Sequence, residues 1–192
     1  MKPNELFEIF NKFSLSIYAL ILLAIWSFFE AGIWFIIPDY LLLFFVIINP
    51  QLAKKYFFVV FIFSALGIIA HLIFLILHPD LGLILLQNTP FLSKDSFEIV
   101  QKSIIDLGYL GLLLQPFSSI PVKVWNYEAV KMGINLVFYL VLIALSRALR
   151  MGLVSILGYF FGKRFSRSLK KNFITFLIIY SILLILILLF VS

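Results

Sequence analysis

Long apolar stretches without a polar face dominate the chain. Residues 56–78, 134–161 and 172–191 are hydrophobic almost throughout. A membrane-barrel strand would alternate apolar and polar residues, and a soluble amphipathic helix would keep one polar stripe. Stretches of about 20 apolar residues have the length of a helix that crosses the hydrocarbon core of a bilayer. The pattern therefore predicts an all-α integral membrane protein with about three transmembrane spans at these positions.

Two further apolar segments, residues 13–49 and 107–133, are interrupted by polar residues near their middle. A straight helix over 13–49 would be about 55 Å long, nearly twice the thickness of the hydrocarbon core. Each segment must therefore fold back on itself. We expect two re-entrant helical hairpins, with Pro38 at the tip of the first and Pro121 at the tip of the second.

The more polar segments complete the expected topology. Residues 1–12 suit a short helix at the membrane surface, and 79–106 form an aqueous segment with an amphipathic helix at 96–107. Residues 163–171 form a basic loop, which the positive-inside rule places in the cytoplasm. The two hairpins then enter from opposite sides, an inverted arrangement typical of transporters. Residues 13–192 make one membrane domain, in which Gly158 and Gly162 form a helix-packing motif.

Composition supports a membrane location and argues against several other classes. The chain is 64% hydrophobic, which leaves too little polar surface for a water-soluble protein. The net charge of +6 does not indicate nucleic-acid binding, because five of the fifteen basic residues lie in 163–171. The chain has no cysteine and only two histidines, so we expect no disulfide, no metal site and no cofactor. We expect a multi-pass protein of the cell (cytoplasmic or inner) membrane.

We expect five ionisable residues to lie near the bilayer centre and to mark the candidate working site: Glu30, Asp39, Lys123, Arg147 and Arg150. Each costs about 2.5–3.5 kcal/mol at the centre of a bilayer on insertion scales. We therefore expect the two acids to lie near the two arginines. The structural alternative is that these charges only hold the hairpins against the long helix. However, three cations and two anions leave an excess positive charge, which favours a water-filled or anion-accepting cavity.

The residue types suggest distinct roles. Arg147 and Arg150 are three residues apart, so they share a helix face and could hold one phosphate, most naturally a lipid headgroup, with Lys123 nearby. Glu30 and Asp39 are candidates for proton or ion coupling, because burial favours the protonated carboxyl. His71 is more typical of a hydrogen-bonded packing residue. The chain has no serine–histidine pair, paired aspartates or HExxH motif, so we do not expect an enzyme.

Three motifs resemble a known family. The first, FFEAGIWFIIPDYLL at 28–42, resembles the E-A-S-F-F-P-I-P-P-D-V-L-L signature of the YqaA-like branch of the DedA family, also called VTT or SNARE-associated membrane proteins. The other two are FSSIPVKVWN at 117–126 and LSRALRM at 145–151, and they follow in the family's order. The five charged residues match the motif charges. The chain departs from the pattern at Phe35, Ile37 and Ser119, which replace prolines, and at Ser146 and Ala148, which replace glycines.

The resemblance implies a membrane transporter with two opposed re-entrant hairpins. Family members include flippases for undecaprenyl phosphate and, in eukaryotes, phospholipid scramblases. We therefore expect a flippase or scramblase for a phosphate-bearing lipid. A proton-coupled carrier of a small ion or cation is an alternative, and a non-transporting membrane assembly protein is another. The sequence identifies neither the lipid nor the ion, and it leaves the oligomeric state open, a homo-oligomer included.

The expected topology can be tested with single cysteines, because the chain has none of its own. Ser168→Cys in the basic segment should react only with a membrane-permeant thiol reagent in intact cells. Ser93→Cys in the 79–106 segment should also react with an impermeant one. The reverse pattern would overturn the predicted orientation.

Overall fold

The protein is all-helical wherever the computed structural model describes it, which is at residues 2–32, 37–89, 92–93, 95–118 and 120–190. Its helices, in chain order, are α1 (Pro3–Leu15), α2 (Ile17–Glu30), α3 (Pro38–Ile48), the short 3₁₀ helix η1 (Pro50–Leu52), α4 (Ala53–Leu77), α5 (Pro79–Gln87), α6 (Asp95–Leu107), the 3₁₀ helix η2 (Gly108–Phe117), α7 (Val122–Lys131), α8 (Leu136–Lys171) and α9 (Phe173–Phe190).

Two helical stretches are long and apolar enough to cross a membrane: Pro50–Leu77, which is η1 with α4, and α8. They correspond to the predicted spans 56–78 and 134–161. Helices α1 and α2 meet at a 70° bend and pass the same test only as a pair. The third predicted span corresponds to α9, whose described apolar part, Phe173–Leu186, is shorter than a full crossing. Within the described residues there are thus two helices of spanning length, or three if the bent pair is one broken span.

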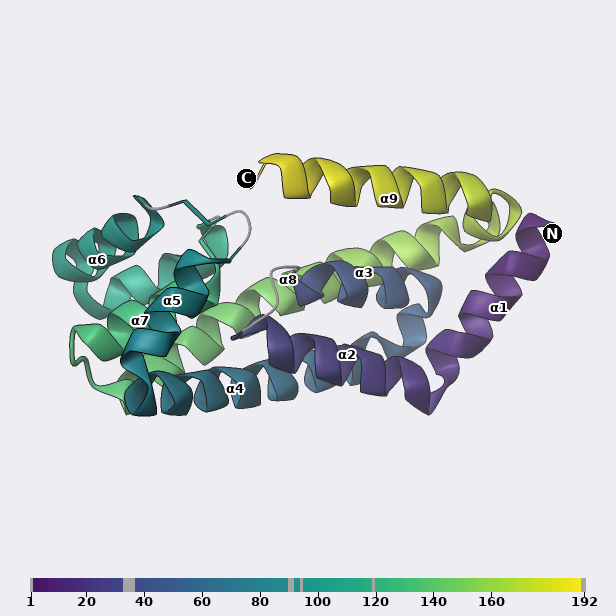
Figure 1. Ribbon diagram of the computed structural model, residues 1–192. Helices are drawn as coiled ribbons and strands as arrows, with labels where there is room; N and C mark the ends of the chain where they lie inside the picture. The colour runs from purple at the N-terminus through teal and green to yellow at the C-terminus, as the bar shows by residue number, and fades with distance from the viewer. Residues whose placement is uncertain (1, 33–36, 90–91, 94, 119, 191–192) are drawn as a thin grey trace.

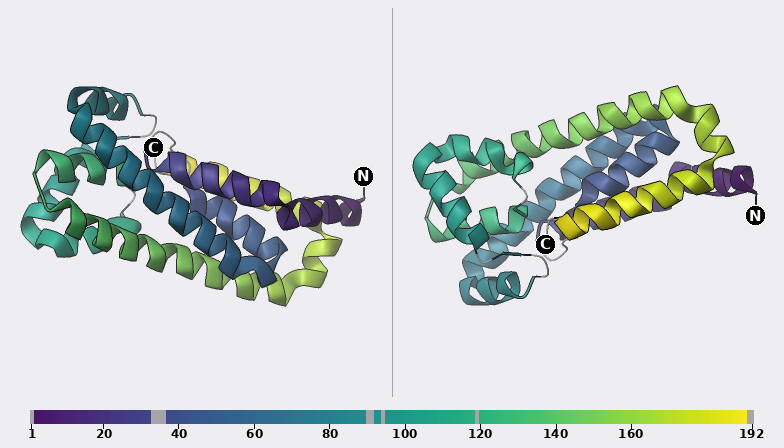
Figure 2. Two further views of the ribbon diagram at one scale, coloured as in Figure 1. Left: turned by 90° about the horizontal axis from the view of Figure 1, so that it is seen from below. Right: turned by 90° about the horizontal axis from the view of Figure 1, so that it is seen from above.

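Helices α2, α3, α4 and α8 run alongside one another and form the body of the molecule (Figure 1). Helices α5, α6 and α7 gather at one end of this bundle. Helix α1 and the turn between α8 and α9 lie at the other end, and α9 runs back along the bundle from that turn (Figure 2). Two apolar clusters result, one around Phe45 and Tyr56 and the other around Trp125 and Tyr139.

Both predicted interruptions are present between helices. The first separates α2 from α3, and its residues 33–36 lie outside the described part of the chain. The second separates η2 from α7. Pro38 is the first residue of α3, and Pro121 precedes α7 as its cap, which are positions that suit the fixed φ of proline. The entry of each segment into the membrane as a re-entrant hairpin stays a prediction. The predicted helix at 96–107 is confirmed as α6.

The basic stretch 163–171 is helical, so its prediction as a loop was wrong. Helix α8 has 36 residues, about 54 Å, and continues without a break to Lys171. The segment contains neither glycine nor proline to stop the helix, and cations are favourable at a helix C-terminus. Its five basic side chains occupy positions i, i+1, i+4, i+7 and i+8. They therefore form one exposed face, within about 120° of the helix circumference.

Gly158 and Gly162 let α8 approach α3 closely, which confirms the predicted packing motif. A Cβ atom added at Gly158 would lie 2.9 Å from Val46 Cγ1. One added at Gly162 would collide with the backbone carbonyl of Ile47. Backbone cannot move aside as a side chain can, so Gly162 is the stricter of the two requirements.

We predict that Gly162→Ala destabilises the protein by about 1–3 kcal/mol through this overpacking. The matched control is Gly152→Ala on the same helix. There the nearest heavy atom to the added Cβ, Phe57 Cε2, is 3.9 Å away, so the change should be neutral or slightly stabilising. Thermal unfolding of the purified proteins in detergent measures both. Equal effects of the two substitutions would contradict the packing role.

Candidate functional site

One face of α8 changes from apolar to charged and back within three helical turns. Ile143, Arg147 and Met151 are four residues apart and therefore lie one above another. Ile143 belongs to the apolar cluster at the α7 end, and Met151 belongs to the cluster at the α3 end. Arg147 thus lies at the boundary between the two clusters. Charge at this position has little access to water, so it requires partners from the protein.

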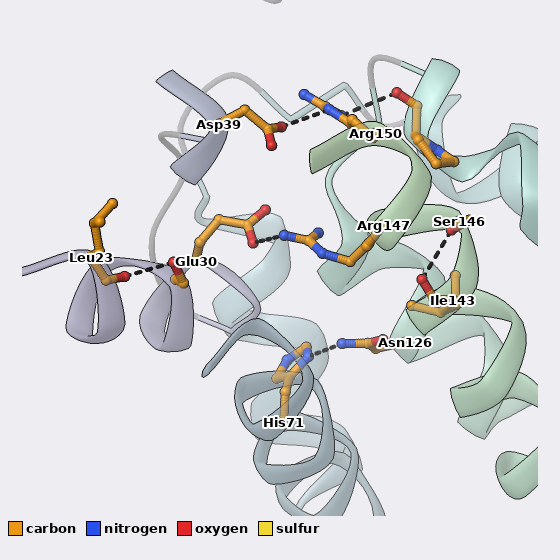
Figure 3. Close-up of polar contacts among 11 residues, drawn as sticks. Leu23, Glu30, Asp39, His71, Asn126, Ile143, Ser146, Arg147 and Arg150 are labelled. Atoms are coloured by element: carbon orange, nitrogen blue, oxygen red, sulfur yellow. Dashed lines mark hydrogen bonds and ion pairs between the residues drawn. The ribbon is translucent and has the colours of Figure 1, made fainter. Parts of the chain in front are cut away.

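Glu30 is the partner of Arg147. Its Oε2 atom lies 2.6 Å from Arg147 Nη2, and each side chain is only 8% exposed (Figure 3). Glu30 is the last residue of α2, so its carboxylate comes from the point where the first broken segment is interrupted. A carboxylate is unfavourable at a helix C-terminus, because the carbonyl dipoles there already point outward. The guanidinium of Arg147 compensates both that charge and the burial.

Arg150 joins the two broken segments. Its Nε atom lies 2.7 Å from Asp39 Oδ2 at the start of α3, and its Nη1 atom donates a hydrogen bond of 3.1 Å to the carbonyl oxygen of Pro116 in η2 (Figure 3). Asp39 is in the first turn of its helix, where negative charge is favoured. The Arg150 side chain is 29% exposed, so this pair is the more accessible of the two.

The expected proximity of acids and arginines is therefore confirmed: Glu30 pairs with Arg147, and Asp39 pairs with Arg150. Lys123 is fully buried on α7 and lies within electrostatic range of Glu30. The structure thus gathers all five predicted site residues from α2, α3, α7 and α8.

Among the positions where the chain departs from the family pattern, Ser146 is buried and donates a hydrogen bond to the Ile143 carbonyl. Phe35 and Ser119 lie outside the described residues.

A second polar group continues from the ion pairs between α4, α7 and α8. Asn126 is fully buried, and its Nδ2 atom lies 2.9 Å from His71 Nδ1. Tyr139 donates a hydrogen bond of 2.6 Å to Asn126 Oδ1. His71 is thus hydrogen-bonded inside the protein, as expected of a packing residue. Because the Asn126 amide donates to Nδ1, His71 is neutral in this arrangement, with its proton on Nε2.

Several buried polar atoms at the site form no hydrogen bond with the described residues: Asp39 Oδ1, Gln115 Oε1 and Arg147 Nε. Buried polar atoms are normally satisfied, so each such atom needs an explanation. Asp39 Oδ1 is an acceptor and Arg147 Nε a donor within the two ion pairs themselves, and Gln115 directly precedes Pro116, whose carbonyl binds Arg150. The site therefore retains hydrogen-bonding capacity for a polar group that enters it. No grouping of three histidine, aspartate or glutamate side chains suited to a metal ion occurs within the described ranges.

Sequence reasoning missed three buried polar residues. Asn126 and Tyr139 belong to the network with His71, and Glu128 is fully buried on α7 with Lys131 3.2 Å away. The sequence did contain one indication of Asn126. It follows Lys123 by three residues, so both lie on one helix face in a segment otherwise treated as apolar. Glu128 was not counted among the membrane charges, although it is as deeply buried as Lys123.

Comparisons of this chain with protein-family models, with curated proteins and with solved structures found no match. The family resemblance thus rests on the three motifs alone.

We predict that Glu30→Met or Arg147→Met alone destabilises the protein by about 3–5 kcal/mol, because each leaves one buried charge without its partner. The double substitution Glu30→Met/Arg147→Met should recover most of this loss, since two apolar side chains suit the surrounding clusters. Chemical unfolding of the purified proteins measures the coupling. Additive losses would mean that the two side chains do not depend on each other.

Proposed function

We propose that this protein is a membrane transporter of the DedA/VTT type that flips or scrambles a phosphate-bearing lipid, either a phospholipid or a polyprenyl phosphate. The observation that carries the proposal is the arginine pair. Arg147 and Arg150 share one face of α8 and hold, between them, carboxylates from the first broken segment and a carbonyl from the second. A group that displaces these partners would act on both broken segments at once.

The proposed step is an exchange of ion-pair partners. In the structure the two carboxylates neutralise the arginines, so neither guanidinium group lacks a counterion. A lipid phosphate presents several charged oxygens, and planar guanidinium groups bind such oxygens with paired, charge-assisted hydrogen bonds. The unbonded Nε of Arg147 offers one further donor. The displaced Glu30 remains within range of Lys123.

The interruptions explain why such an exchange would move parts of the protein. Glu30 is at the end of α2, Asp39 is at the start of α3, and Pro116 lies just before the second break. Backbone conformation changes most easily where helices end. Loss of the contacts to Arg147 and Arg150 would release both breaks, and this would open a path for the headgroup between the two sides of the membrane.

A proton-coupled carrier of a small ion or cation is the second candidate. It is favoured by Asp39 Oδ1, a buried carboxylate oxygen that forms no hydrogen bond with the described residues. A proton on this oxygen would leave the Oδ2 hydrogen bond in place but neutralise the carboxylate that pairs with Arg150, so proton uptake would act on the ion pair. In a third alternative, a non-transporting assembly protein, the ion pairs would serve only to hold the helices together.

We predict that Arg147→Lys and Arg150→Lys each slow lipid flipping by at least about tenfold, because lysine keeps the charge but loses the fork that holds two phosphate oxygens. The measurement is dithionite quenching of fluorescent, headgroup-labelled lipids in proteoliposomes. Arg164→Lys is the matched control, an exposed position on the same helix, and it should flip lipid at the unmodified rate.

The charge swap Glu30→Arg/Arg147→Glu separates transport from structure. It keeps an ion pair between α2 and α8, so folding should be largely retained, yet it moves the guanidinium away from Arg150. We expect a folded protein that does not flip lipid. If the swapped protein or either lysine variant moved lipid at the normal rate, the headgroup site would be wrong. Ion flux without lipid movement would instead favour the carrier.

A further inference from the structure

A groove of about 550 Å³ runs along α8 on the side away from the arginine pair, between that helix and the first turns of α4. Gly152 lines it and follows Arg147 by five residues, which places it about 140° further around the helix. The groove is thus separate from the proposed transport site, and binding there does not depend on the transport proposal.

Gly152 has no packing reason to be glycine. At Gly158 and Gly162 an added Cβ would meet α3, whereas at Gly152 it would meet nothing closer than Phe57 Cε2 at 3.9 Å. Glycine inside a helix costs about 0.5–1 kcal/mol relative to alanine. The physical effect of this glycine is to leave the floor of the groove without a side chain, and so to keep space there.

The lining of the groove is almost wholly apolar, and lysine side chains lie at one end of it. Helices α4 and α8 are in contact and run in opposite directions, so the beginning of α4 lies beside the basic end of α8 (Figure 1). Lys54 lines the groove at this end. The Lys163 ammonium lies 5.6 Å from the ring centroid of Tyr159, which is also a lining residue. One to two helical turns before Tyr159 on α8, the lining residues are Ile156 and Gly152, which lie opposite Phe57 of α4.

Ser155 lies between the two ends. Its side chain lines the groove, is only 7% exposed, and its hydroxyl forms no hydrogen bond with any described residue. A serine inside a helix normally donates back to a carbonyl of the preceding turn when it has no other partner. The hydroxyl oxygen is itself enclosed by protein atoms. The groove therefore has Lys54 at one end, with Lys163 next to its lining residue Tyr159, and an apolar channel over a glycine further along.

We infer that this groove binds one anionic phospholipid. The order along the groove is that of the lipid itself, in which a charged phosphate group is followed by apolar acyl chains. Lys54 and Lys163 take the phosphate, and the acyl chain passes over Gly152. The apolar part would accept the chain of any lipid, but two ammonium groups at the polar end select a negatively charged headgroup.

The test is the thermal stability of the purified full-length chain in detergent, with added phosphatidylglycerol or with phosphatidylcholine of the same acyl chains. A ligand that binds the folded state raises the melting temperature. Phosphatidylglycerol should raise it by about 5 °C more than phosphatidylcholine at saturating lipid. Native mass spectrometry should show one retained phosphatidylglycerol per chain.

Three variants locate the site, each compared with its own lipid-free melting temperature. Gly152→Leu fills the channel without changing charge and improves helix propensity, so it should fold and lose the phosphatidylglycerol shift. The double variant Lys54→Ser/Lys163→Ser should also lose the shift in melting temperature caused by phosphatidylglycerol. The matched control Lys55→Ser/Arg164→Ser removes the same charge from the neighbouring exposed positions of the same two helices, and it should keep the shift.

Four results would overturn the inference. The first is an equal response to the two lipids, and the second is a full shift in Gly152→Leu. The third is an equal loss in both double variants, which would indicate general surface charge. The fourth is the absence of a lipid effect together with a dimer that Gly152→Leu dissociates, because the groove would then be covered by a second copy of the chain.

Discussion

The arrangement of this protein depends on the burial of charge on one helix. Arg147 is at the boundary of two apolar clusters, and its charge is tolerable there only because Glu30 meets it at 2.6 Å. That requirement fixes the end of α2 against the middle of α8. Arg150 likewise holds the start of α3, through Asp39, and η2, through the Pro116 carbonyl, against α8. Three separate stretches of the chain, which contribute α2 with α3, η2 and α8, are thereby held together at one point.

This reliance on charge makes the same point suitable for a change of state. A purely apolar contact between α2, α3 and α8 would have no specific competitor in a membrane, since lipid chains are equally apolar. An arginine bound to a carboxylate does have one, because a phosphate binds guanidinium at least as well. The ion pairs that hold these helices together are in this account also what makes the protein responsive to a lipid headgroup.

Much of the site could be predicted from sequence because charge inside an apolar run is rare and visible. Glu30, Asp39, Lys123, Arg147 and Arg150 stand out from their neighbours, and electrostatic cost alone implies that opposite charges meet. The buried acid that was missed, Glu128, lies three residues before Lys131, so it resembled a member of an exposed ion pair on a helix. Asn126 and Tyr139 carry no charge, and only the packing of α7 against α4 and α8 brings them to His71.

The fold was predicted less completely, for identifiable reasons. Apolar length identified α4 and α8, because spanning length is a property of a single segment. The end of α8 was taken for a loop because its five basic residues were treated only as a topology signal, although lysine and arginine are good helix formers. The groove beside Gly152 could not be foreseen. A glycine that keeps a space open and one that permits close packing look alike until the neighbouring helix is in place.

The central claim is that Arg147 and Arg150 exchange their carboxylate partners for a lipid phosphate. Solid-state NMR can measure this as the dipolar coupling between arginine ¹³Cζ and lipid ³¹P in proteoliposomes. Arg164 and Arg167, the chain's other arginines, would be replaced by lysine so that only the site carries the label. The account predicts a coupling that corresponds to about 4 Å between guanidinium carbon and phosphorus, the separation that paired hydrogen bonds impose. Absence of this coupling in protein that actively flips lipid would contradict it.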